Sequence, residues 1–94
     1  MKSNFKKIEE KILNAAIDIA KNGKGALFVI GSNVKYEKLL KQKLEPFSVF
    51  SKGAEKLIKS LGTIDGAVII DQKGYVIEYG VMIKGTKAFV GYGT

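Results

Sequence analysis

The 94-residue chain contains no cysteine, histidine, arginine or tryptophan. Without cysteine and histidine it cannot build a thiolate zinc site, a disulfide framework, or a Ser-His or Cys-His nucleophilic pair. A bound metal would therefore be a hard cation held by carboxylates and by the phosphates of a substrate, as magnesium commonly is. The lack of arginine removes the bidentate guanidinium group that favours phosphate and guanine, which leaves only the point charges of lysine.

Long apolar runs are absent as well. No segment reaches the ~18 continuous apolar residues of a membrane span, and the first residues lead into a charged, amphipathic pattern instead of the apolar core of a secretion signal. We therefore expect a cytoplasmic protein without a membrane span. A hydrophobic content of 46% and a charged content of 27% are typical of globular proteins.

Charge is strongly one-sided, because all 16 basic residues are lysines and the net charge is +7. A surplus made of lysine alone is often a compositional bias, which is the interpretation favoured here. The alternative is that the general positive field attracts an anionic ligand such as a nucleotide or a nucleic acid. Nucleic-acid binding by this segment is not expected.

Apolar residues at three- and four-residue spacing predict an amphipathic helix over residues 4–21, which packs on a sheet in preference to lying on a membrane surface. The all-apolar stretch 25–31 predicts a strand buried on both faces. Residues 31–33 follow this strand and favour a plain turn, with a phosphate-contacting loop as the alternative. This succession indicates an α/β or α+β fold.

The middle of the chain predicts two further helices. The first covers residues 36–44 and ends at Pro46, because proline cannot continue a helix. A short strand follows at 47–50. The next helix begins at Ser51 as N-cap and ends at Gly62 in a left-handed conformation. The residues predicted to point inward from it are Ala54, Leu57, Ile58 and Leu61.

A strand-turn-strand unit is predicted from 63 to 83, with a buried strand at 67–70. Asp71 is expected in the hairpin turn, and Gly74 supplies its positive φ. Strict alternation would place Val76, Glu78 and Gly80 on one face and Tyr75, Ile77, Tyr79 and Val81 on the other, with Glu78 solvated. A second turn is expected at 84–86, before a final apolar segment at 88–94.

Asp65 stands where the buried strand begins, directly before Gly66. Asp-Gly is among the commonest turn pairs, and an aspartate there often only hydrogen-bonds its own backbone. The alternative is a functional carboxylate beside a glycine that allows the backbone to approach a ligand closely. The residues around Asp65 favour the second interpretation, as follows.

Three features occur in order: Gly25-Ala26-Leu27 opening a strand, Asp65-Gly66-Ala67-Val68-Ile69-Ile70 after a helix, and Gly93-Thr94. With this set the chain resembles, over most of its length, the diadenylate cyclase (DAC) domain, which is the nucleotidyltransferase domain of the DNA-integrity scanning protein family. In that family an Arg-His-Arg phosphate-binding motif follows the Gly-Thr pair. Residues 1–94 are therefore expected to form a single but incomplete DAC-like domain, the N-terminal half.

The resemblance implies a mixed central sheet flanked by helices. It also implies a reaction in face-to-face dimers, in which two ATP molecules become cyclic di-AMP and two pyrophosphates. It implies Asp65 as the catalytic residue and as the ligand of Mg²⁺ or Mn²⁺. A carboxylate that holds a metal and helps to deprotonate a hydroxyl suits phosphoryl-type transfer, in which the protein mainly positions groups and neutralises charge. The nucleotide-binding residues implied are Gly66, Ala67, Met82, Ile83, Gly93 and Thr94.

Without the Arg-His-Arg motif the triphosphate lacks its clamp, so we expect the 94-residue polypeptide alone to make no cyclic dinucleotide. A half-domain would also leave an unpaired strand edge, so a homodimer, a higher oligomer or a missing C-terminal half is expected to cover it. Two alternatives stay open. One is a non-catalytic interaction scaffold of the roadblock or profilin-like kind, and the other is a nucleotide-binding relative that has lost catalysis and acts as a sensor.

Overall fold

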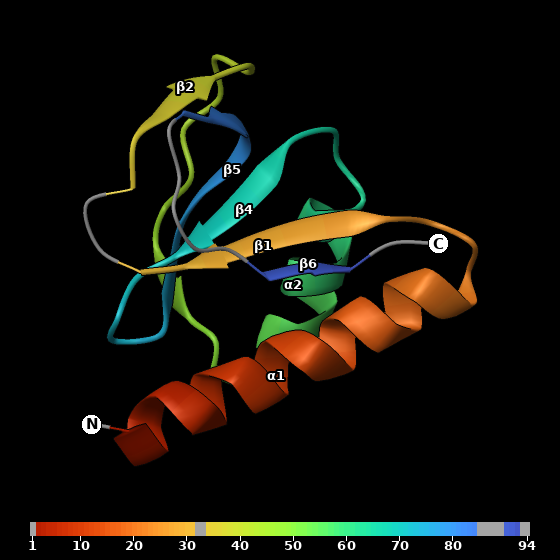
Figure 1. Ribbon diagram of the computed structural model, residues 1–94, viewed down its shortest axis with the longest axis vertical. Helices are drawn as coiled ribbons and strands as arrows, with labels where there is room; N and C mark the ends of the chain where they lie inside the picture. The colour runs from red at the N-terminus through yellow and green to blue at the C-terminus, as the bar shows by residue number, and fades with distance from the viewer. Residues whose placement is uncertain (1, 32–33, 85–89, 93–94) are drawn as a thin grey trace.

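The computed structural model of the chain describes residues 2–31, 34–84 and 90–92, which form two helices and a single sheet (Figure 1). The helices are α1 (Lys2–Lys21) and α2 (Ala54–Gly62). The strands are β1 (Ala26–Ile30), β2 (Tyr36–Lys38), β3 (Phe47–Ser48), β4 (Ala67–Ile70), β5 (Tyr75–Ile83) and β6 (Val90–Tyr92). Within these ranges no helix is both long enough and apolar enough to cross a membrane.

The sheet is mixed, with the strand order β2-β5-β4-β1-β6, and β3 also pairs with β5. β1 and β4 run parallel, and every other described pair is antiparallel. β6 is the last strand on its side and pairs only with β1 among the described strands. This arrangement confirms the predicted α+β class with a mixed central sheet and flanking helices.

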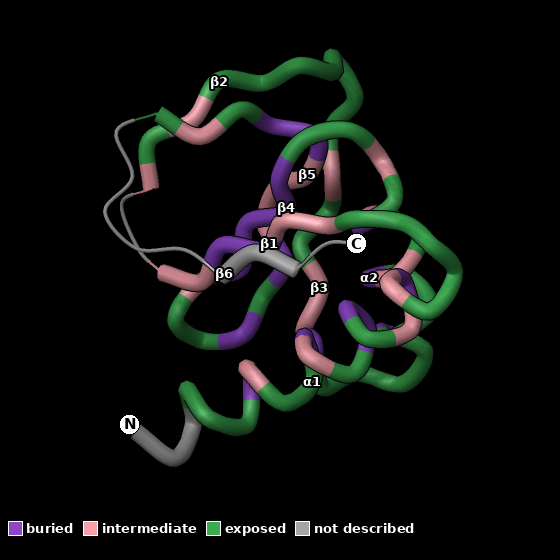
Figure 2. Tube along the Cα trace, turned by 45° about the vertical axis from the view of Figure 1, so that its right-hand side comes forward, coloured by how far each residue is buried: buried purple, intermediate pink, exposed green. Residues whose placement is uncertain are grey.

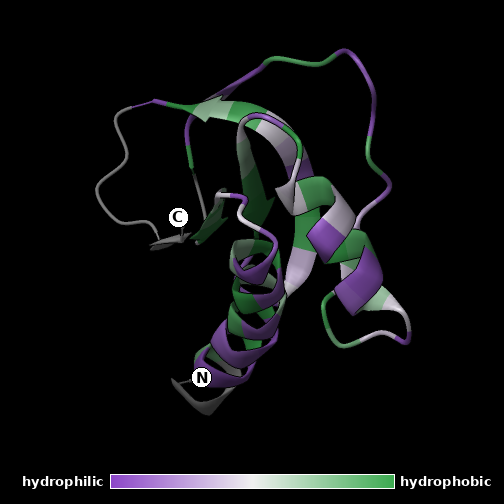
Figure 3. Ribbon diagram, turned by 90° about the vertical axis from the view of Figure 1, so that its right-hand side faces the viewer, coloured by the Kyte–Doolittle hydropathy of each residue, from purple (hydrophilic) through white to green (hydrophobic). Residues whose placement is uncertain are grey.

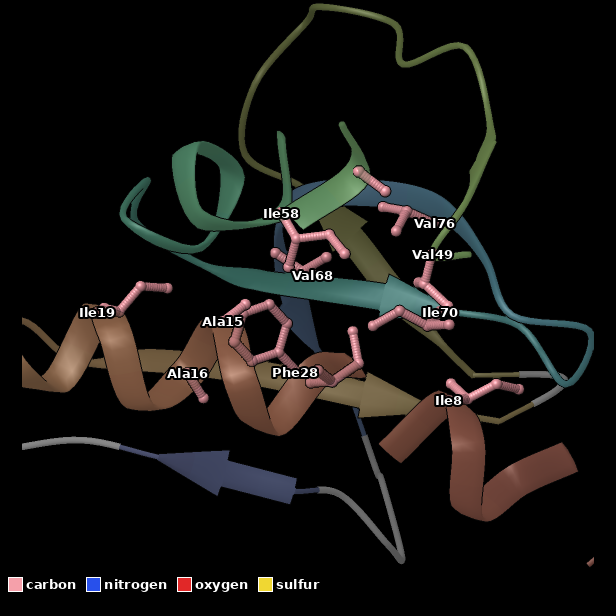
Figure 4. Packing of buried hydrophobic residues seen from close by; sticks show 12 residues of the cluster. Ile8, Ala15, Ala16, Ile19, Phe28, Val49, Ile58, Val68, Ile70 and Val76 are labelled. Atoms are coloured by element: carbon pink, nitrogen blue, oxygen red, sulfur yellow. The ribbon is translucent and has the colours of Figure 1, made fainter. Parts of the chain in front are cut away.

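Both faces of the central strands are buried, as the all-apolar stretches predicted. Phe28 of β1 and Val68 of β4 face the helices, whereas their neighbours Val29 and Ile69 belong to a second cluster on the opposite face. Purple, buried segments accordingly concentrate along β4 and the parts of β1 and β5 beside it (Figure 2). The first cluster joins α1, α2 and the sheet through Ile8, Ile12, Ala15, Ala16, Ile19, Phe28, Val49, Ala54, Ile58, Val68, Ile70 and Val76 (Figure 4).

α1 confirms the helix predicted over 4–21 and begins slightly earlier, at Lys2. Its buried side chains Ile8, Ile12, Ala15 and Ile19 recur at three- and four-residue intervals, so they form one stripe against the sheet. The predicted strand 25–31 is β1, and the predicted strand 47–50 shortens to β3.

The helix predicted over 36–44 is wrong. Tyr36–Lys38 form β2, which pairs antiparallel with the end of β5, and residues 39–46 are irregular (Figure 3). These leucines have helical spacing, but they do not pack into the core, since Leu39 is 53% exposed and Leu40 36% exposed. Pairing with the free edge of β5 satisfies backbone groups and packs Tyr36 on the second cluster, and this tertiary gain outweighs a weak helical preference.

Three details of the helix predicted after Ser51 are also wrong. Gly53, with φ +81°, is the N-cap of α2, and the Ser51 hydroxyl instead donates to the Ser48 carbonyl oxygen at 2.6 Å. Leu57 is 52% exposed and does not point inward. Gly62 is the last helical residue, and the C-cap that follows it is right-handed, so this glycine is not a left-handed stop.

Gly62 is required by packing between α1, α2 and β1. A Cβ atom at this position would lie 2.7 Å from Ile19 Cδ1 and 2.9 Å from Phe28 Cζ. Alanine would favour the helix by up to about 1 kcal/mol, but overpacking costs about 1–3 kcal/mol. We therefore expect Gly62→Ala to lower the free energy of unfolding by about 1 kcal/mol, measured by urea denaturation. The exposed Ser60→Ala on the same helix is the control, and an unchanged or higher stability of Gly62→Ala would contradict the packing described.

Strict alternation along β5 is wrong because the strand contains two irregularities. Ile70 pairs with Val76, Ile69 with Glu78, and Ala67 with Val81, so β5 holds an extra residue in each interval. As a result Val76 and Tyr79, which are an odd number of positions apart, both pack on the helix-side cluster, while Ile77 and Val81 belong to the opposite one. The bulges are non-local features that the sequence pattern of this strand does not reveal.

The turn between β4 and β5 is confirmed. Asp71 Oδ1 accepts hydrogen bonds from the backbone N–H groups of Lys73 and Tyr75, both at 2.9 Å. Gly74 has φ +90°, the left-handed conformation that the turn needs. The second turn predicted at 84–86 and the final segment at 88–94 lie largely outside the described residues, apart from Lys84 and β6.

Candidate functional site

Asp65 lies at the mouth of β4, two residues before Ala67, the first residue of the strand. It is exposed, and its carboxylate makes no hydrogen bond or ion pair with any residue that the structure describes. Asp71, at the other end of the same strand, makes two hydrogen bonds to its own turn. Asp71 therefore stabilises its turn, whereas Asp65, although it precedes a glycine, makes no such hydrogen bond.

Gly66 brings the start of β4 against the backbone of β5. Its φ is +104°, and a Cβ atom there would lie 2.8 Å from both Gly80 C and Val81 N. Gly80 itself has φ +62° and occupies one of the irregular intervals of β5. The two glycines thus allow two backbones to meet directly beside Asp65, so Gly66 has a structural reason to be glycine in addition to any contact with a ligand.

Met82 is brought to the same end of the sheet. Ala67 pairs with Val81, so one further step of this register places Met82 across from Gly66, and Met82 is 48% exposed. Ile83 is half-buried, pairs with Tyr36 and packs on the second cluster. Ala67 is only 1% exposed, so the protein itself covers its side chain, which belongs to the second cluster.

Gly93 and Thr94 lie outside the described residues, but the strand before them ends near Asp65. Tyr92 pairs with Ala26, and Leu27 pairs with Ala67, so Ala26 is level with Gly66. Two strand spacings separate β6 from β4, which is about 10 Å. The register therefore directs the end of β6 to the same end of the sheet as Asp65.

Gly31, the one described residue of the loop 31–33 that was considered for phosphate contact, lies at the other end of the sheet. Gly31 follows the carboxyl end of β1 and donates its N–H to Ile70 O at 2.9 Å. Residues 32 and 33 are outside the described part. Because β1 and β4 are parallel, Gly31 and Asp65 are separated by the whole length of β4, about 13 Å or more, so they do not share a site.

Leu40 is the neighbour of Asp65 that the sequence did not reveal. Its Cδ1 atom lies 2.8 Å from the point where a Cβ of Gly80 would stand, and the Asp65 carbonyl oxygen lies 3.6 Å from the same point. The backbone N–H of Leu39 donates to Gly80 O at 3.0 Å and so fixes the segment there. The sequence predicted a separate helix for Leu40, and a residue in such a helix would not be expected beside Asp65.

Glu78 is not on a solvated face, contrary to the sequence prediction. Its side chain is 18% exposed, accepts a hydrogen bond from Tyr36 OH at 3.1 Å and lies 3.6 Å from Lys38 Nζ. Burial, and then the neighbouring Glu78 carboxylate, raise the pKa of Tyr36 above its ordinary value. Glu78 pairs with Ile69, two strand residues or about 7 Å beyond Ala67, so it ties β2 to β5 and does not form a carboxylate pair with Asp65.

A polar hollow of about 370 Å³ lies between the C-terminal parts of α1 and α2, and Thr63 lines it. Lys59 Nζ stands 2.7 Å from Asp18 Oδ2 there. This hydrogen bond lowers the pKa of Asp18 and raises the pKa of Lys59. The carboxylate in this hollow is therefore neutralised by an ion pair with Lys59, whereas the carboxylate of Asp65 has no partner among the described residues.

No family model, curated protein or solved structure matches the chain. The function is therefore inferred from the residues and from the geometry of the end of the sheet where β4 begins.

Asp65 could offer a metal ion one carboxylate. In residues 2–31, 34–84 and 90–92 no group of three or more acidic side chains is placed to hold a metal. A magnesium-type ion takes only one or two protein carboxylates and completes its shell with water and substrate phosphates. The donor set at Asp65 fits that mode, in which the nucleotide brings most of the ligands, and does not fit a cage built from protein side chains.

Proposed function

We propose that this chain supplies one side of a diadenylate cyclase-type site, which condenses two ATP molecules into cyclic di-AMP and releases two pyrophosphates. The observation that carries the proposal is the Asp65 carboxylate, exposed and without a partner among the described residues, at a strand mouth that two glycines shape. The resemblance of residues 65–70 and 93–94 to the DAC motifs supplies the chemistry.

In the proposed reaction the ribose hydroxyl oxygen of one ATP bonds to the α-phosphorus of the other, and the bond from that phosphorus to pyrophosphate breaks. Asp65 would hold Mg²⁺ or Mn²⁺ and lie beside the attacking hydroxyl, whose proton it or a water takes up. When bound, the metal ion would neutralise charge on the phosphates. Gly66 would let the nucleotide approach the backbone, with Ala67 behind it and Met82 and Ile83 toward the base.

The site also needs cations for the triphosphate, and the chain contains neither arginine nor histidine. Lysine supplies charge but not a planar, bidentate contact. A second polypeptide segment that brings such groups is therefore part of the proposal, together with a second copy that presents the other ATP. We place the reaction in the cytoplasm, where ATP is available.

Calorimetric titration with ATP and with cyclic di-AMP, with and without Mn²⁺, tests the proposal. We expect heat with ATP that depends on Mn²⁺, because Asp65 and the phosphates would share the ion. We expect no cyclic di-AMP by chromatography when the 94-residue polypeptide is incubated alone with ATP. The absence of heat with either nucleotide would contradict the proposal and favour the roadblock or profilin-like scaffold, in which the outer edge of β6 would serve as the interface.

A sensor predicts a different pattern. It would bind cyclic di-AMP or ATP, yet a longer polypeptide carrying the Arg-His-Arg segment would still produce no cyclic di-AMP. Production of cyclic di-AMP by that longer polypeptide would exclude the sensor.

A further inference from the structure

We propose that Leu40, on the irregular segment 39–46, contacts the base of the nucleotide that binds at Asp65. The inference rests on the proposed function and adds a residue that no motif of the resemblance includes. Leu40 would supply an apolar contact for that base.

The segment that carries Leu40 is fixed to β5 on both sides of this residue. Before it, the Leu39 N–H donates to Gly80 O at 3.0 Å and extends the β2–β5 ladder by one residue. After it, Gln42 accepts a hydrogen bond from Tyr79 OH at 2.8 Å through Oε1 and another from Lys38 Nζ at 3.1 Å through its carbonyl oxygen. Leu40 is therefore held in place although its segment has no regular secondary structure.

The side chain of Leu40 and the backbone of Asp65 meet over Gly80. Leu40 Cδ1 and the Asp65 carbonyl oxygen both lie within 3.6 Å of the point where a Gly80 side chain would begin. Leu40 thus stands beside the strand mouth that presents the free carboxylate. A ligand that extends from the Asp65 carboxylate across Gly80 would reach Leu40.

The surface here has the composition that a base-binding wall needs. Leu39 is 53%, Leu40 36% and Met82 48% exposed, and the pairing of β5 with β2 and β4 brings these three apolar residues to the end of the sheet where β4 begins. Ligand sites combine predominantly apolar walls with a few placed polar groups. The exposed Lys41 and Lys43 on the same segment would favour an anionic ligand, because the surrounding field is positive.

Binding of ATP and of tripolyphosphate, each with Mn²⁺, separates a base contact from a structural role. We expect Leu40→Ala to weaken ATP binding about tenfold, because the base loses apolar contact area, and to leave the affinity for tripolyphosphate unchanged. Leu40→Met keeps an apolar side chain of similar volume and should retain ATP binding within about threefold. Leu57→Ala removes the same atoms from a leucine on α2 that is 52% exposed and distant from Asp65, and it should change neither affinity.

The outcomes separate this inference from the proposed function. If Leu40→Ala binds ATP as the unmodified chain does, while Asp65→Asn does not, Leu40 is not a base contact and the proposed function stands. If Leu40→Ala loses ATP and tripolyphosphate equally, its role is structural and the inference is wrong. If the unmodified chain binds ATP no better than tripolyphosphate, no base is recognised and the inference is again wrong. If it binds neither, both proposals fail.

Discussion

Gly66→Ala is expected to lower the free energy of unfolding by about 3 kcal/mol or more, the largest stability effect predicted here. Two causes act together. At φ +104° any residue with a Cβ is strained, which costs about 1–3 kcal/mol. The new Cβ would also stand 2.8 Å from Gly80 C and Val81 N, which are backbone atoms that cannot rotate away. The measurement is the midpoint and slope of urea unfolding.

Gly53→Ala is a matched control for this prediction. Gly53 has φ +81° but would place its Cβ with nothing within 4 Å, so only the backbone strain applies. We expect it to cost about 1 kcal/mol. The difference between the two variants measures the contact between Gly66 and Gly80. Equal losses for both variants would mean that β4 and β5 do not meet at these glycines.

The parts of the fold that depend on local pattern could be predicted from the sequence. The stripe of isoleucine and alanine in α1, the unbroken apolar run of β4 and the turn from Asp71 to Gly74 are each specified by neighbouring residues. None of these elements needs information from distant parts of the chain.

The parts that depend on pairing across the sheet could not be predicted. Tyr36 and the leucines after it have the spacing of a helix, but Tyr36–Lys38 instead pair with the edge of β5 and form a strand. The bulges of β5 arise from its registers with β4, which change twice between Ile70 and Ala67. Gly62 resembles a helix stop, and only the positions of Ile19 and Phe28 show that it is a packing residue.

The candidate site also combines features set by neighbouring residues with features set by contacts between distant segments. Asp65 and Gly66 are adjacent in sequence, so their placement at a strand mouth was predictable. The contact of Gly66 with Gly80 and the presence of Leu40 above Gly80 join three separate segments of the chain. Single-sequence reasoning carries no signal for such a meeting, and Leu40 was for that reason assigned to a helix.

Asp65→Asn is expected to reduce Mn²⁺-dependent ATP affinity at least tenfold, the largest functional effect predicted here. The substitution keeps the size of the side chain but removes the negative charge that a hard cation requires. Because Asp65 has no partner among the described residues, the variant should unfold within about 0.5 kcal/mol of the unmodified protein. A loss of binding would then report on the carboxylate and not on the fold.

Glu10→Gln is the matched control for charge. Glu10 is an exposed carboxylate on α1 without an ion pair among the described residues, and its replacement changes the net charge by the same amount. We expect it to leave ATP affinity within about twofold, since a surface charge distant from the site is largely screened by salt. A comparable loss in both variants would indicate a general electrostatic effect.

The central claim is that Asp65 is a metal-side carboxylate for a nucleotide. The most direct test is calorimetric titration of the unmodified chain, Asp65→Asn and Glu10→Gln with ATP at saturating Mn²⁺. We predict binding by the unmodified chain and Glu10→Gln, and a loss of at least about tenfold for Asp65→Asn. Equal ATP binding by all three proteins, or no binding by any of them, would contradict the claim.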